Sequence, residues 1–202
     1  MASQTDICNL ALSFLGSATI TTITDSSTAA RVLIAEYEFV RDAELRAHTW
    51  RFAIKRAALP ALAAPPLTGP FLLQYQLPAD CLKILVAGDY FPSADMSNYR
   101  TNQSDATYLV EGNVIVTSYP APMALRYVYR VEDEGLFDAS FTIAFAARLA
   151  WLCCERITQS PDKRKLAMTE YTKALTDAIR ANAIEHVTDF PSDDTWILAR
   201  MQ

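Results

Sequence analysis

The stretch TYLVEGNVIVT, residues 107–117, decides the fold class of this chain. Its two halves are rich in β-branched and aromatic residues and flank Glu111, Gly112 and Asn113. Because glycine adopts positive φ without strain, the pattern predicts a β-hairpin with its turn at Gly112. Similar runs occur at residues 71–77, 82–87 and 124–129. We therefore expect a small antiparallel β element in the middle of the chain.

Helical periodicity precedes this β element. Apolar residues at helical spacing predict a first helix over residues 5–15, capped by Thr5 or Asp6 and ended near Gly16. A second, longer helix follows a cap at Asp25 or Ser26 and ends by residue 49. Its predicted buried stripe consists of Ala30, Leu33, Ile34, Tyr37, Val40 and Leu45.

The spacing of charged residues in the second helix predicts ion-pair partners for its charged side chains. Asp42 and Arg46 are four residues apart on its outer side, a spacing at which opposite charges pair. Arg41 instead projects from the apolar stripe. It therefore requires a carboxylate partner, either in its own chain or in a neighbouring one.

Helical periodicity returns after the β element. Ser160 and Pro161 separate two further helices, with Ser160 as the cap and Pro161 in the first turn of the last helix. The third helix is expected to bury Phe137, Phe141, Phe145, Leu149 and Leu152, and the fourth Met168, Tyr171, Leu175 and Ile179.

This order of elements predicts an α+β fold, with a discontinuous helical bundle of two N-terminal and two C-terminal helices around a central antiparallel β insert. We divide the chain into a helical domain (residues 1–49 and 131–186), a β-rich insert (residues 50–130) and a C-terminal tail (residues 187–202).

The composition is that of a globular protein with an acidic balance. Hydrophobic residues make up 51% of the chain, and 23 acidic against 18 basic residues give a net charge of −5. This charge argues against tight DNA binding, which depends on Lys and Arg neutralising phosphates. No apolar run approaches the roughly 20 residues that span a bilayer. The first residues also lack the features of a signal peptide, so we expect neither a membrane partner nor export.

Residue types that carry catalysis are sparse and scattered. Only two histidines occur, His48 and His186, and the sequence contains no zinc-binding motif and no G-x-S-x-G elbow. The glycines form no phosphate-binding loop, and the acidic run at residues 132–138 favours a helix dipole over a cation. Cys153 and Cys154 are adjacent in an apolar stretch, which favours packing over a vicinal disulfide or redox site. We therefore expect no enzyme, no cofactor and no metal.

Basic and aromatic residues are most densely mixed at residues 46–56. One interpretation is contact with DNA or with a neighbouring subunit. The alternation of Trp50, Phe52 and Ile54 with Arg51 and Lys55 favours the other interpretation, a strand with one buried face.

An ordered set of short motifs runs through the chain. It comprises Asn9-Leu10-Ala11-Leu12, Leu15-Gly16, Asp25-Ser26-Ser27, Ala29-Ala30-Arg31, Tyr37, Val40-Arg41-Asp42, Leu45-Arg46-Ala47-His48, Trp50, Phe52-Ala53 and Tyr75-Gln76-Leu77-Pro78-Ala79-Asp80-Cys81-Leu82, then the helical stretch 144–152 and Glu170-Tyr171. With these motifs the chain resembles the tail tubular protein A family of short-tailed bacteriophages. The resemblance is densest before residue 85 and does not extend to the C-terminal tail.

The resemblance implies a structural virion protein at the head–tail junction, assembled in the host cytoplasm. Proteins of this family form a ring of twelve copies that joins the portal protein to the tail nozzle and lets double-stranded DNA pass without sequence recognition. Helical segments 29–48 and 137–184 would form the ring wall, the insert (71–129) would face the nozzle, and the tail (186–202) would anchor the ring to the portal. The expected subunit or portal contacts are Arg31, Tyr37, Arg41, Trp50, Trp196, Ile197 and Leu198. The residues that line the DNA channel are not indicated.

Three other functions stay open from the sequence. A head-completion connector of a long-tailed phage would have the same helical core. A cytoplasmic helical module would bind a ligand or peptide near Trp50. A hydrolase would use His48 with a serine or an acid.

Overall fold

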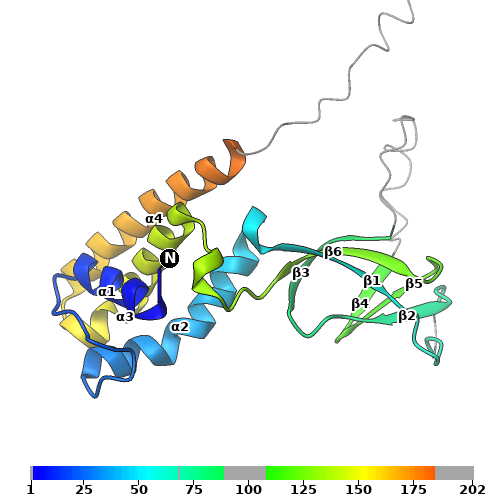
Figure 1. Cartoon of the computed structure of the whole chain (residues 1–202), viewed down its shortest axis with the longest axis horizontal. Helices are drawn as coiled ribbons and strands as arrows, with labels where there is room; N and C mark the ends of the chain where they lie inside the picture. The colour runs from blue at the N-terminus through cyan, green and yellow to red at the C-terminus, as the bar shows by residue number, and fades with distance from the viewer. Residues whose placement is uncertain (1, 68, 89–107, 185–202) are drawn as a thin grey trace, which may run out of the picture.

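The computed structural model describes residues 2–67, 69–88 and 108–184. Within these ranges four α-helices form a bundle, and two small antiparallel sheets form an insert that projects from one end of it (Figure 1). The insert lies in sequence between the second and third helices. This arrangement confirms the predicted α+β fold with a β insert between N-terminal and C-terminal helices.

Two serines begin the N-terminal helices. Helix α1 (Gln4–Phe14) has Ser3 as its N-cap, and Ser3 and Asp6 form a reciprocal capping box with N···O distances of 2.9 and 3.2 Å. Helix α2 (Thr28–Ala47) is capped by Ser27, whose hydroxyl accepts a hydrogen bond from the Ala30 amide. The caps predicted at Thr5 or Asp6 and at Asp25 or Ser26 are therefore wrong by one to three residues. The predicted end of α1 is confirmed, since Gly16 follows it with φ of +61°.

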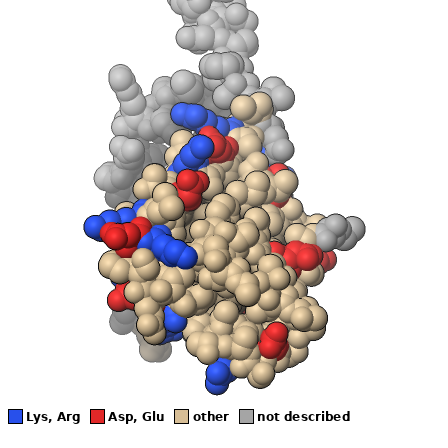
Figure 2. Space-filling model, turned by 90° about the vertical axis from the view of Figure 1, so that its left-hand side faces the viewer, with Lys and Arg blue, Asp and Glu red and all other residues tan. Residues whose placement is uncertain are grey.

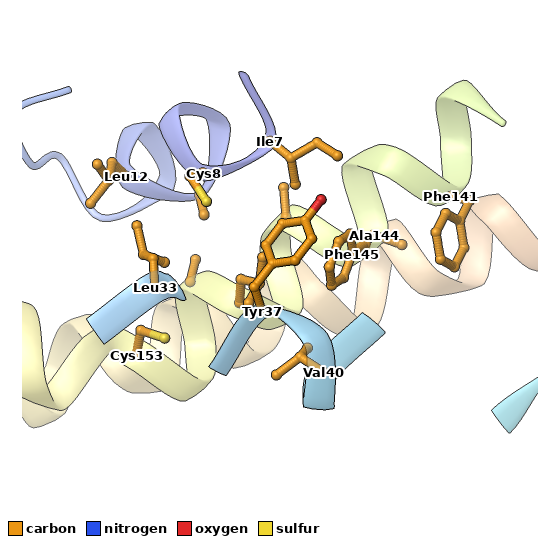
Figure 3. Packing of buried hydrophobic residues seen from close by; sticks show 14 of the residues in the cluster. Ile7, Cys8, Leu12, Leu33, Tyr37, Val40, Phe141, Ala144, Phe145 and Cys153 are labelled. Atoms are coloured by element: carbon orange, nitrogen blue, oxygen red, sulfur yellow. The ribbon is translucent and has the colours of Figure 1, made fainter. Parts of the chain in front are cut away.

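Helix α3 (Ala139–Thr158) is the centre of the bundle, because α1, α2 and α4 (Pro161–Ile184) each pack on it. Figure 3 shows side chains of α1, α2 and α3 converging on one core. The labelled members are Ile7, Cys8, Leu12, Leu33, Tyr37, Val40, Phe141, Ala144, Phe145 and Cys153.

The predicted apolar stripes are only partly buried. Ile34 is 44% exposed and Leu152 is 40% exposed, whereas both were expected in the core. On α4, Met168 and Ile179 are also exposed. Helix α4 instead approaches α3 through Ala167 and Ala178, its two fully buried residues. Small side chains at the contact bring the helices close together and leave the larger ones at the border.

The insert is built from two three-stranded sheets that share one apolar core. The first sheet has the order β1 (Ile54–Leu59), β6 (Met123–Tyr129), β3 (Cys81–Ala87). The second has the order β2 (Leu73–Gln76), β5 (Val114–Thr117), β4 (Tyr108–Glu111). Glu111 pairs with Val114 across the predicted hairpin turn, and Gly112 has φ of +60°. The expected hairpin is confirmed.

The segment before β1 differs from its prediction. Arg51–Ala53 forms a 3₁₀ turn, and regular strand pairing begins only at Ile54. Trp50 is therefore not part of an alternating strand. It lies on the bundle side, where its ring meets Phe141 edge to face at a centroid distance of 5.0 Å.

Candidate interaction surfaces and a buried ionic network

A buried carboxylate links three helices of the bundle. Glu44 of α2 has no exposed surface, and its Oε2 accepts hydrogen bonds from Arg148 of α3 and from the Tyr171 hydroxyl of α4, the latter at 3.1 Å. Its backbone carbonyl accepts a hydrogen bond from Trp50 Nε1 at 3.0 Å. Trp151 stacks on the Tyr171 ring at 5.8 Å. This network links α4, whose largest contact is with α3, to α2.

The network pairs a buried carboxylate with an arginine and a tyrosine but leaves two of its polar atoms without a hydrogen bond. Glu44 Oε1 and Arg148 Nε are buried and have no hydrogen-bond partner in the described part of the protein. Burial, followed by the negative charge of Glu44, raises the pKa of Tyr171 to about 12. Tyr171 therefore remains a proton donor to the carboxylate, which suits a structural link between helices rather than proton transfer.

A second set of polar contacts joins the bundle to the insert. Asp42 of α2 binds Arg41 at 3.0 Å and Arg130, just after β6, at 2.7 Å. Arg46 donates to the carbonyl of Leu82 in β3. The expected Asp42–Arg46 pair is therefore wrong, because both side chains turn to residues that the insert brings to them. The partner required by Arg41 is found within the chain, at Asp42.

Asp80 organises the adjoining end of the insert. It accepts from Lys55 Nζ at 2.8 Å and from the Tyr127 hydroxyl at 3.1 Å. Partial burial opposes ionisation of Asp80, yet the hydrogen bonds from Lys55 and Tyr127 outweigh it, so its pKa is lowered. The same hydrogen bond raises the pKa of Lys55.

Several predicted contact residues lie inside the bundle. Tyr37 and Trp50 are 0% and 1% exposed, and Arg41 is 6% exposed. Tyr37 donates to Glu134 at 3.3 Å and packs against Phe145. Because these three side chains are occupied by contacts within their own chain, they are not available to a partner in this conformation, and we correct that expectation. Arg31 is exposed on α2. Trp196, Ile197 and Leu198 lie outside the described residues.

Two apolar stripes lie on the outer surface of the bundle. The first, which we call the α2 surface, consists of Ala35, Phe39 and Ala43 at a spacing of four residues, and Phe39 is 77% exposed. The second, the α4 surface, consists of the exposed Met168 and Ile179, with the half-buried Leu175 between them. In Figure 1, α2 and α4 form opposite borders of the bundle. Sequence periodicity did identify the α4 stripe, but it indicated burial within the chain.

One end of the bundle is almost free of charge. Residues 7–24 contain no Asp, Glu, Lys or Arg. Figure 2 shows this end, where uncharged side chains form a continuous area in the middle and the charged ones lie around it, many of them above and to the left. The loop after α1 is held by Asn9, which exchanges hydrogen bonds of 2.8 and 3.0 Å with the backbone of Ile20. A groove of about 370 Å³ runs between this loop and Ile157.

A smaller groove of about 250 Å³ lies beside Trp50 and is lined by Arg51, Phe52, Phe137, Asp138 and Asn182, among others. Its volume is below the roughly 300–1,000 Å³ typical of small-molecule sites. The small volume of this groove therefore does not favour a module that binds a ligand beside Trp50.

The residue types considered for catalysis have packing roles. Burial raises the pKa of both Cys8 and Cys153 to about 12, so neither thiol ionises near neutral pH. Cys154 is also buried and lies next to the Thr158 hydroxyl. His48 packs edge to face on Trp50 at 5.6 Å. Among the described residues no group of three His, Cys, Asp or Glu side chains is placed to hold a metal ion, and no helix is long and apolar enough to cross a membrane.

The chain was compared with protein-family models and with curated proteins. No protein-family model matches the chain, and no curated protein matches it.

Proposed function

We propose that this chain is a structural adaptor of a phage tail, which forms a ring between the portal and the tail nozzle and acts through its surfaces rather than through catalysis. The observation that carries the proposal is the pair of apolar stripes on α2 and α4. A ring of identical copies uses a heterologous contact, in which each copy offers two different surfaces. Two stripes on opposite borders of one small bundle meet that requirement.

The remaining features agree with this role. The resemblance to the tail tubular protein A family, which is carried by ordered motifs, supplies the partners: the portal on one side and the nozzle on the other. The charge-poor end of the bundle is suited to a broad contact, because a surface without charges loses little hydration free energy when it is covered. The projecting insert provides a second region of contact.

The first test is direct. The purified protein is mixed with the portal ring of the same virus and imaged by electron microscopy. An additional closed ring beneath the portal supports the proposal. Absence of added density, with both proteins folded, contradicts it.

Variants then test the two stripes separately. Phe39→Glu and Met168→Glu each place a charge on one stripe, and we expect both to abolish ring closure on the portal while leaving the thermal unfolding midpoint nearly unchanged. Leu67→Glu is the matched control, because Leu67 is fully exposed on the insert. On the portal, a mixture of the two stripe variants retains one intact contact per pair of copies, so it should give docked pairs of subunits and no closed rings. Closed rings from this mixture would contradict a heterologous contact between the stripes.

A further inference from the structure

Charge is distributed unevenly between the two parts of the chain. The segment 50–130 contains seven Lys and Arg against five Asp and Glu, a net charge of +2, whereas the remainder contains 11 against 18, a net charge of −7. The insert is therefore basic, whereas the rest of the chain is acidic, and the insert projects from the bundle (Figure 1).

The strand register concentrates this positive charge on one sheet face. Arg56 of β1 lies directly opposite Arg126 of β6, so both side chains point to the same side of the sheet. That side is the outer one, because the alternate residues Leu125 and Tyr127 point into the core of the insert. Both arginines are exposed, and neither has a hydrogen-bond or ion-pair partner among the described residues.

The surroundings extend the basic character of this face. Lys83 of β3 lies opposite Val128 in the next row toward the bundle, and Arg46 reaches the backbone of β3. In the row on the other side of the two arginines, Ala58 faces Ala124, and both are exposed. These small side chains leave the guanidinium groups accessible to a broad ligand.

Two like charges directly opposite each other on a sheet destabilise the pairing unless an anion neutralises them. We propose that this face, defined by Arg56, Lys83 and Arg126, contacts the phosphate backbone of duplex DNA without reading its sequence. Adjacent phosphates supply a row of negative charges that matches a row of cations. The other residues of β1 and β6 on this side of the sheet are Ile54, Ala58, Ala124 and Val128, which offer no aromatic ring on which an unpaired base could stack, so the duplex fits better than a single strand.

This inference goes beyond the adaptor role and does not depend on ring formation. If the chain forms a ring on the portal but does not bind duplex DNA, the DNA contact is refuted and the adaptor role stands. If the chain binds DNA but never joins a portal, only the adaptor role is refuted. The net charge of the whole chain makes the expected binding weak and strongly dependent on salt.

The test is fluorescence anisotropy with a labelled duplex of random sequence, titrated with the full chain over a series of salt concentrations. The variant Arg56→Gln/Arg126→Gln should bind at least about tenfold more weakly at low salt. Because each neutralised phosphate contributes a slope of about −0.9 to the log–log salt dependence, losing two contacts should flatten that slope by about 1.8. Arg56→Lys/Arg126→Lys should retain binding, since lysine keeps the charge.

The matched control is Arg31→Gln/Lys173→Gln, which removes two exposed cations from the bundle and changes the net charge equally. It should bind within about twofold of the unaltered chain. Equal losses in both double variants would show a diffuse charge effect and overturn the inference. So would an unaltered chain that does not bind the duplex at low salt. An effect of Arg56 and Arg126 on self-association alone, measured by sedimentation, would assign this face to acidic residues of a second copy and would likewise overturn it.

Discussion

Replacing Arg148 with methionine tests whether the buried ionic network holds the bundle together. The change leaves the fully buried Glu44 carboxylate with the Tyr171 hydroxyl as its remaining side-chain donor. Removing one partner of a buried ion pair costs about 3–5 kcal/mol. The Arg148 side chain is 21% exposed, so some solvent screening already operates and the lower end applies, about 3 kcal/mol. For a chain of this size that corresponds to a fall of roughly 6–12 °C in the unfolding midpoint.

Urea and thermal unfolding followed by circular dichroism measure this loss. The double variant Glu44→Leu/Arg148→Met should recover most of the stability, because apolar side chains of similar volume replace a buried ion pair at little or no cost. Arg164→Met is the control, since Arg164 and Glu155 form an exposed pair whose loss should cost less than about 1 kcal/mol. If Arg148→Met stays within about 1 kcal/mol of the unaltered chain, or if the two substitutions are additive in a double-mutant cycle, the network does not stabilise the bundle as argued.

Three further predictions follow from the insert and the core. Gly88→Ala should destabilise the insert by more than about 1 kcal/mol, because Gly88 has φ of +89° and an added Cβ would lie 2.6 Å from the Tyr119 ring; a stability equal to that of the unaltered chain would contradict this. Asp80→Asn should lower stability near neutral pH by less than about 1 kcal/mol, since its pair with Lys55 is partly exposed. Because the pKa of Asp80 is lowered on folding, the ionised carboxylate contributes stability above the ordinary carboxyl pKa of 3.8, and this contribution is lost as the pH falls through the lower pKa of the folded state. The urea midpoints of Asp80→Asn and of the unaltered chain should therefore differ near neutral pH and converge in acid. The buried thiol of Cys153 should react with a maleimide reagent only at the rate of local or global opening, and rapid labelling of the native protein would refute its burial.

Local sequence patterns predicted the elements of the fold more accurately than their ends. The hairpin at Gly112 was predictable because both the turn residue and the flanking strand residues are local signals. The caps were not, since Ser3, Thr5 and Asp6 are all suitable residues and only the backbone conformation selects Ser3. The stripe on α4 was found correctly as a pattern, but periodicity does not distinguish a surface covered by its own chain from one left for a partner.

The partners of the polar side chains could not be predicted locally, because they are far away in the sequence. Asp42 was expected to pair within its helix, yet it binds Arg130, which is 88 residues away in sequence. No local pattern brings those two side chains together. Glu44 did carry a signal, because it continues the buried spacing of Leu33 and Tyr37 along α2 and therefore required a partner. Its identity as Arg148 follows only from the packing of α2 on α3.

The two exposed stripes also bear on when a ring would form. Burying an apolar side chain contributes about 1.5–3 kcal/mol when it moves from full exposure to full burial, and here only Phe39 is more than two-thirds exposed, while Met168 and Ile179 are about half and one-third exposed. A contact based on these residues gains only a few kcal/mol, which the loss of translational and rotational freedom on association largely cancels. The free chain should therefore be monomeric at micromolar concentration. A template that holds neighbouring copies side by side removes most of that entropic cost, so the same weak contact becomes sufficient once the subunits are docked. A stable ring in the absence of the portal would mean that contacts beyond the two stripes, such as those of the charge-poor end, contribute most of the binding free energy.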